Sequence, residues 1–77
     1  MYGDIMEQES KLCYTAVVRK TGYGIGIVKE GESGYYATNW PDVDSYDKAV
    51  KWAKEMNERL ELSDDEVNKM VARSMFP

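Results

Sequence analysis

The sequence predicts an α+β domain in which a three-stranded antiparallel β-meander is followed by two helices, in the order βββαα. Three observations predict this fold. Residues 11–40 hold three apolar stretches separated by glycine-containing turns, residues 44–60 carry apolar side chains at helical spacing, and a helix-capping signature starts at residue 63. The chain has 77 residues, enough for one domain with a modest core. We expect a weakly ordered, polar segment over residues 1–10 and a single domain over residues 11–77.

The three strands are expected at residues 11–20, 23–30 and 35–40. Thr21-Gly22 is expected to form the first turn, because glycine tolerates a positive φ, and residues 31–34 form the second. Pro41 ends the third strand, because proline cannot donate a hydrogen bond to the ladder. The cross-strand pairs that follow from these turns are Lys20–Tyr23, Val18–Ile25, Ala16–Ile27, Gly31–Gly34, Ile25–Trp40 and Ile27–Thr38.

Side chains alternate between the two faces of a strand, so these pairs sort the residues of the sheet. One face is expected to form the core: Tyr14, Ala16, Val18, Tyr23, Ile25, Ile27, Tyr36 and Trp40. The other face is mixed: Thr15, Val17, Arg19, Gly24, Gly26, Val28, Tyr35, Ala37 and Asn39. In a meander the first strand is an edge, and Leu12–Val18 is apolar and lacks proline, so a homodimer through residues 12–18 is expected as one option.

Two helices follow the sheet. Asp44 is expected to be the N-cap of the first, with Asp47 at its third position. Its apolar stripe is Tyr46, Ala49, Val50, Ala53, Met56 and Leu60. Ser63 and Glu66 form a capping box for the second helix, and Leu62 and Val67 flank it as a hydrophobic staple. We expect the first helix to cover the core face and the second to pack against the first or along the edge of the sheet, with Trp52 between the helices.

The residues that usually carry catalysis are scarce, which indicates a non-enzymatic protein with no cofactor and no metal. The chain has no His, and its one cysteine, Cys13, is expected to be a small half-buried strand residue. The stretch Gly22-Tyr23-Gly24-Ile25-Gly26 does not match the dinucleotide fingerprint G-x-G-x-x-G, because the third glycine would have to stand at position 27, where this chain has Ile27. The stretch also lies within a hairpin. Asp42, Asp44 and Asp47 do not match a calcium loop. An enzyme would need a site shared between subunits.

The net charge of −4 argues against direct binding of nucleic acid, which depends on Lys and Arg. The chain has no apolar run long enough to cross a membrane and no disulfide, so a cytoplasmic protein is expected. The acids gather where the two helices begin, at Asp42, Asp44 and Asp47 and at Asp64, Asp65 and Glu66. Helix capping accounts for most of them, and binding to a basic partner is the alternative.

A second candidate binding surface lies on the mixed face of the sheet. Tyr35 shares this face with Val17 and Val28, and Arg19 and Asn39 could give it a polar rim. Exposed together, these residues would mark a surface for a protein partner. The alternative is a lightly buried second face.

The strand at 14–18, Asn39-Trp40, and the joint at 57–62 leading into Ser63-Asp64-Asp65-Glu66 resemble those of small uncharacterised bacteriophage and mobile-element proteins. The resemblance covers most of the chain. It implies a regulator or inhibitor of a host protein in the bacterial cytoplasm, of an anti-CRISPR-like or other anti-defence kind. The six acids at the helix starts would then occupy the basic groove of a nucleic-acid-binding enzyme.

Two alternatives remain. The strand at 14–18, the hairpin after it and Ser45-Tyr46-Asp47-Lys48-Ala49 resemble the HicB-type antitoxin domain, which implies a small basic toxin as the partner. That family has a further strand where this chain has a second helix. The other alternative is a sheet that binds single-stranded nucleic acid by stacking bases on Tyr35 beside Arg19.

Overall fold

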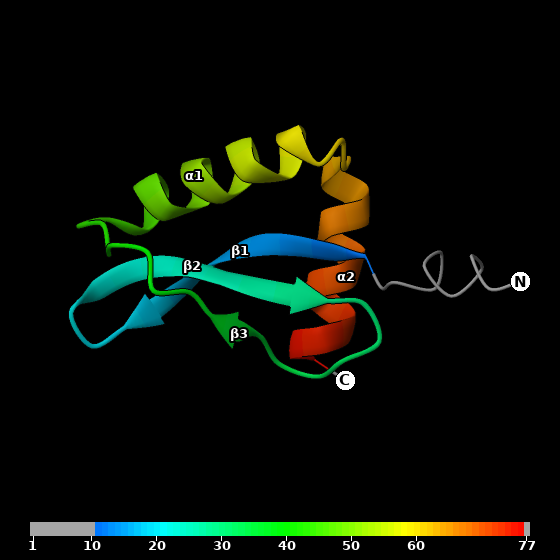
Figure 1. The fold of residues 1–77 in the computed structure, drawn as a ribbon, viewed down its shortest axis with the longest axis horizontal. Helices are drawn as coiled ribbons and strands as arrows, with labels where there is room; N and C mark the ends of the chain where they lie inside the picture. Colours follow the sequence, from blue (N-terminus) through cyan, green and yellow to red (C-terminus); the bar gives the residue numbers. More distant parts are fainter. Residues whose placement is uncertain (1–10, 77) are drawn as a thin grey trace, which may run out of the picture.

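A computed structural model describes residues 11–76, and it contains a three-stranded antiparallel sheet followed by two helices (Figure 1). The strands lie in the order β1-β2-β3, so the predicted α+β class and the βββαα order are confirmed. The segment expected over residues 1–10 lies outside the described residues. The elements are β1 (Leu12–Arg19), β2 (Gly22–Lys29), β3 (Tyr36–Ala37), α1 (Tyr46–Arg59) and α2 (Asp64–Met75).

The register of β1 against β2 differs from the prediction by two residues. Arg19 pairs with Gly22, so the turn is Lys20-Thr21, and Ala16 rather than Val18 faces Ile25. Gly22 is therefore a strand residue rather than a turn residue. The backbone of residue 43 passes close beside it, because a Cβ at Gly22 would lie 2.8 Å from the carbonyl oxygen of Val43. A shift of two residues keeps every side chain on its predicted face.

The third strand is much shorter than predicted. Only Tyr36 and Ala37 pair with β2, opposite Ile27 and Gly26, so the expected pairs of Ile25 with Trp40 and of Ile27 with Thr38 are wrong. The chain leaves the ladder at Thr38 because the Thr38 hydroxyl takes over the backbone's role and donates to the carbonyl of Ile25 at 2.8 Å. The chain returns at residue 43, where two backbone hydrogen bonds of 3.0 and 2.7 Å join Val43 to Tyr23.

The predicted core face is covered by α1. Ile25 is buried beneath the helix, where Ala49 and Ala53 are also buried. Trp52 does not lie between the helices, as was expected. Its ring stacks on Trp40 at 5.5 Å between centroids, and Trp40 stacks on Tyr14 at the same distance. Trp52 therefore belongs to the contact between α1 and the sheet. Val18 and Tyr36, which were expected in the core, are exposed.

The opposite face of the sheet is also buried in part, which agrees with one of the two alternatives predicted for it. Cys13 and Val28 are fully buried against Met70 of α2, beside the partly buried Leu62 and Val67. In Figure 1, α1 runs along the top of the sheet, whereas α2 stands at a steep angle to it behind the end of β2. We expected α2 to pack against α1 or along the edge of the sheet, but it packs on this face, where it buries the two apolar side chains that β1 and β2 present. Burial raises the pKa of the Cys13 thiol.

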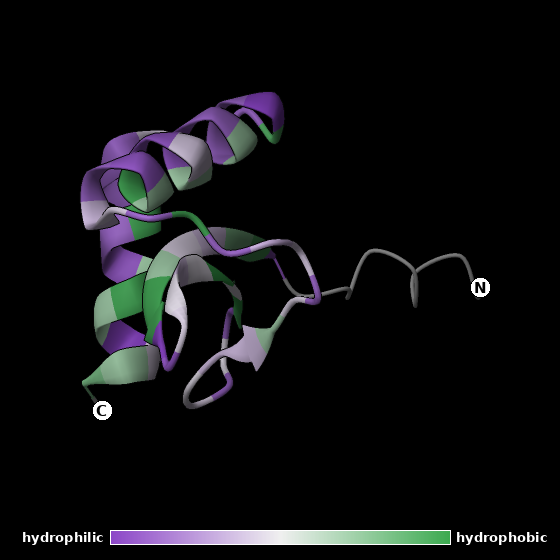
Figure 2. Cartoon of the chain, turned by 90° about the vertical axis from the view of Figure 1, so that its left-hand side faces the viewer, coloured by the Kyte–Doolittle hydropathy of each residue, from purple (hydrophilic) through white to green (hydrophobic). Residues whose placement is uncertain are grey.

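The hydropathy of the residues along the backbone agrees with burial of both faces of the sheet. Figure 2 shows hydrophobic residues gathered in the sheet and in the neighbouring part of α2, while the outer turns of α1 are hydrophilic. The chain changes direction between the helices at Glu61, whose φ of 61° is in the left-handed region. This turn sends α2 to the far side of the sheet.

The predicted start of α2 is confirmed, whereas the predicted N-cap of α1 is wrong by one residue. The capping box of α2 is confirmed: the Ser63 hydroxyl accepts a hydrogen bond from the Glu66 amide at 3.2 Å, and the Glu66 carboxylate accepts from the Ser63 amide at 3.2 Å. The N-cap of α1 is Ser45 rather than Asp44, because the Ser45 hydroxyl accepts from the amide of Lys48 at 3.2 Å.

Candidate functional site

The mixed face of the sheet, where a partner surface was one prediction, holds few free side chains. Val28 and Val17 are buried. The ring of Tyr35 lies against Gly26, where a Cβ would be 2.6 Å from the Cδ1 atom of the ring. Tyr35 is 40% exposed and Asn39 is exposed. This half of the sheet matches the alternative of a lightly buried second face, and the glycines at 24 and 26 make room for side chains rather than for another backbone.

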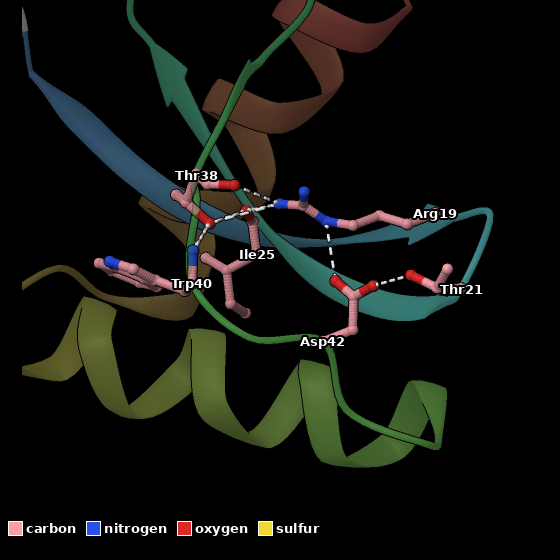
Figure 3. A network of polar contacts seen from close by, with 6 residues as sticks. All are labelled: Arg19, Thr21, Ile25, Thr38, Trp40 and Asp42. Carbon is pink, nitrogen blue, oxygen red and sulfur yellow. Dashed lines mark hydrogen bonds and ion pairs between the residues drawn. The ribbon is translucent and has the colours of Figure 1, made fainter.

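Arg19, the predicted rim of that surface, is held within a polar network (Figure 3). Its side chain lies over Gly24, where a Cβ would be 2.3 Å from Nε. The guanidinium donates to the carbonyls of Ile25 at 3.1 Å and Thr38 at 3.0 Å. Its Nε is 3.3 Å from a carboxylate oxygen of Asp42, whose other oxygen accepts from the hydroxyl of Thr21. Arg19 and Asp42 therefore join the hairpin to the segment after β3.

Two other predicted acids have partners within the chain. Lys48 lies 2.9 Å from Asp44, and the hydrogen bond between them lowers the pKa of Asp44. Glu66 accepts from the Ser63 amide and lies 3.3 Å from Lys11, and both contacts lower the pKa of Glu66. The remaining acids, Asp47, Asp64 and Asp65, are exposed. The acids of the two helix starts lie at opposite ends of α1, which is roughly 20 Å long at 1.5 Å per residue, so the structure does not gather them into one cluster.

The outer edge of β1 presents a different kind of site, and its first component is Asn57. The Asn57 side chain is polar but buried, on the same face of α1 as the buried Ala49 and Ala53. Its Oδ1 accepts from the backbone amide of Tyr14 at 2.7 Å, and its Nδ2 donates to the carbonyl of Tyr14 at 2.9 Å. The Asn57 amide thus replaces a neighbouring strand at Tyr14.

The spacing of α1 contains one signal for the burial of Asn57. Asn57 stands four residues after Ala53 and eight after Ala49, on the line of α1 that faces the sheet. The predicted stripe instead included Tyr46, Val50 and Leu60, which are exposed.

Beyond Tyr14, the edge of β1 is open at Ala16 and Val18. Alternate residues of a strand direct their backbone groups to the same side, so both share the outward direction of Tyr14. Their partners on β2 agree with this, because Ile25, opposite Ala16, and Tyr23, opposite Val18, use their backbone groups toward the β3 side. Within residues 11–76, the outer amide and carbonyl groups of Ala16 and Val18 have no hydrogen-bond partner.

A groove of about 490 Å³ lies beside this open edge, between α1 and α2. Thr15 and Ala16 contribute to it from β1, and Asn57 closes the end near Tyr14. Its apolar walls come from both helices: Tyr46, Val50 and Ala53 on one side, and Val71, Ala72 and Phe76 on the other. Tyr46 is 50% exposed, Val50 42%, Phe76 80% and, at the open end of the edge, Val18 70%.

The groove combines a row of free backbone donors and acceptors with apolar walls, and its polar side chains include Thr15, Lys54, Asn57, Asp64 and Asn68. Among residues 11–76, no three Asp, Glu or Cys side chains approach closely enough to hold a metal ion. Neither helix of the described chain has the length and apolar character to cross a membrane.

Comparisons with protein-family models, with curated proteins and with solved structures gave no match to this chain.

Proposed function

We propose that this domain is a non-catalytic module that binds an extended segment of another protein along the outer edge of β1. The observation that carries this proposal is the pair of unpartnered residues, Ala16 and Val18, beside the apolar groove. Free backbone groups at the edge of a sheet pair readily with an added strand, and flanking pockets then select the side chains of that strand.

The groove could supply both the backbone pairing and the side-chain pockets that such recognition needs. The side chains of an added strand alternate between the two faces of the sheet. Those on one face meet Tyr46 and Val50 of α1, and those on the other meet Val71 of α2 and Phe76. Asn57 limits the pairing to Ala16 and Val18, so the bound segment is short, with apolar residues on both of its faces.

A regulator or inhibitor would act by capturing such a segment of its target. The anti-defence role that the resemblance to phage proteins implies stays a prediction, as does the antitoxin alternative. The nucleic-acid alternative has less support, because it needs Arg19 and Tyr35 free on an open sheet. The Arg19 guanidinium is instead bonded to the protein's own carbonyls, and Tyr35 lies on Gly26.

A proline substitution tests the proposal by removing one backbone hydrogen-bond donor. The amide of Val18 points outward, so Val18→Pro removes a donor from the open edge and leaves the β1–β2 ladder intact. Val18→Ala is the matched control, because it removes the exposed side chain and keeps the amide. Peptides would be selected from a random displayed library against the wild-type domain and then titrated by fluorescence anisotropy.

We expect a selected peptide to bind Val18→Pro roughly tenfold or more weakly than wild type, because a donor and the strand's fit are both lost. Val18→Ala should bind within a few-fold of wild type, and both variants should unfold cooperatively when followed by circular dichroism. Equal binding to wild type and Val18→Pro would show that peptides use another surface.

A further inference from the structure

We infer that the segment bound at the open edge of β1 is the C-terminal end of a partner protein, with its free carboxylate beside Lys54. This inference rests on the proposed strand addition and names the part of the partner that is bound. It follows from the blocked end of the edge, from the favoured direction of an added strand, and from the charge beside the blocked end.

The open edge of β1 is blocked at one end. The side-chain amide of Asn57 bonds to both outer backbone groups of Tyr14, so it fills the place that a strand residue would take there. A strand that pairs with Val18 and Ala16 therefore cannot continue along the edge past Thr15. A segment whose chain ends at this point fits the edge as it stands, whereas an internal segment has to bend out of the sheet before it reaches Asn57.

The direction of the added strand decides which chain end lies at the block. Antiparallel pairing is slightly more stable per residue than parallel pairing. Because β1 runs from Tyr14 toward Val18, an antiparallel segment runs from Val18 toward Asn57. Its residues opposite Val18 and Ala16 each exchange two hydrogen bonds with β1. The end that then reaches Asn57 is the C-terminus.

A basic side chain lies beside the blocked end. The helix α1 runs back along β1 from the Val18 end, because Tyr46 packs on Tyr23, the partner of Val18. Lys54 lines the groove three residues before Asn57, which places it about 4.5 Å along the helix axis from the block, on the open side. None of the three ion pairs among residues 11–76 uses Lys54, so its ammonium group is available to a terminal carboxylate.

The groove also carries one acid. Asp64 lines it from the first turn of α2. A parallel strand would bring its N-terminal amine to the blocked end, where the carboxylate of Asp64 would attract it. The two strand directions therefore predict opposite responses when the ends of a bound peptide are neutralised.

Neutralising or moving the chain end of a peptide tests this assignment. Peptides would be selected against the wild-type domain from a random library that is displayed through its N-terminus, so that each peptide has a free C-terminal carboxylate. A selected peptide would be synthesised with a free carboxylate, with a C-terminal amide and with a glycine extension after its last residue, and titrated by calorimetry. The amide and the extended peptide should each bind roughly fivefold or more weakly than the free carboxylate.

A substitution at Lys54 tests the partner of the carboxylate. Lys54→Gln should bind the free carboxylate roughly fivefold or more weakly than wild type, and should no longer distinguish it from the amide. Lys51→Gln is the matched control, because it removes an exposed base of the same helix that does not line the groove. This variant should keep the wild-type preference for the carboxylate.

The outcomes separate this inference from the proposed function. A peptide that is weakened by Val18→Pro but binds equally well as carboxylate and amide would overturn the C-terminal assignment and leave the strand addition standing. Loss of affinity on N-terminal acetylation, with none on amidation, would reverse the strand and overturn the assignment as well. Selected peptides that are insensitive to Val18→Pro would overturn the proposed function and, with it, this inference.

Discussion

The two edges of the sheet are finished in different ways. On the β3 side, every gap in the ladder is filled: Tyr36 and Ala37 pair with β2, the Thr38 hydroxyl and the Arg19 guanidinium bond to the carbonyl of Ile25, and Val43 pairs with Tyr23. On the β1 side, one side chain closes the edge at Tyr14, and the next two outward residues are left open.

The comparison shows that this chain can close an edge with side chains alone, and does so where β3 is too short to pair. The stretch at Ala16 and Val18 is therefore open because no side chain of this sequence reaches it, and not because the fold prevents its closure. Loss of a closing side chain should destabilise the domain, whereas changes at the open stretch should affect association and leave stability nearly intact.

The largest effect is expected where the β1 edge is closed. Asn57→Ala leaves a part-buried amide and a part-buried carbonyl of Tyr14 without partners, which should lower the free energy of unfolding by about 3 kcal/mol. Urea denaturation followed by tryptophan fluorescence measures this change. Asn68→Ala, at an exposed asparagine of α2, is the control and should change stability by less than about 0.5 kcal/mol. Similar stabilities for the two variants would mean that Asn57 does not close the edge.

A smaller effect is expected where the β3 edge is closed. Arg19→Met keeps an aliphatic stem over Gly24 but removes the hydrogen bonds to Ile25 and Thr38 and the ion pair with Asp42, and should lower the free energy of unfolding by about 2 kcal/mol. Arg19→Lys restores the charge beside Asp42 without the planar fork, so an intermediate stability is expected in the same denaturation experiment. An Arg19→Lys variant as stable as wild type would show that the hydrogen-bond geometry of the guanidinium is irrelevant, and one no more stable than Arg19→Met would show that the charge beside Asp42 contributes nothing.

The smallest effect concerns the closed end of the β1 edge, where Glu66 contacts Lys11 and the Ser63 amide. These contacts lower the folded-state pKa of Glu66 below its usual 4.5, so the stability they provide is present above that value and is lost as the pH falls through the lowered pKa. Thermal unfolding of wild type and Glu66→Gln should therefore differ at pH 7 and converge in acid. A difference that persists unchanged at pH 2 would contradict this assignment.

Some of this organisation could be predicted from the sequence because it depends on local periodicity. Strand alternation assigned the residues of β1 and β2 to the right faces even though the turn was misplaced by two residues, since side chains repeat every two residues. The Ser63 capping box is likewise a contact within four residues of chain.

The rest depends on contacts between distant residues. Asn57 and Tyr14 are 43 positions apart, and nothing in the neighbourhood of either residue signals their pairing. Arg19 looked like the rim of a surface because its role requires the space above Gly24 and a carbonyl that β3 leaves free. The placement of α2 was missed because the face it covers presents only two buried apolar side chains near that helix, Cys13 and Val28.

The side chains that close the β3 edge have a consequence for how far this protein can assemble. A sheet with two open edges adds strands without end, and such growth produces fibres and precipitates. Within residues 11–76, the edge of the sheet on this side is β3, which is only two residues long, whereas β1 has eight residues. A very short edge strand offers another sheet little backbone to pair with, so we expect end-to-end growth through the β3 side to be unfavourable.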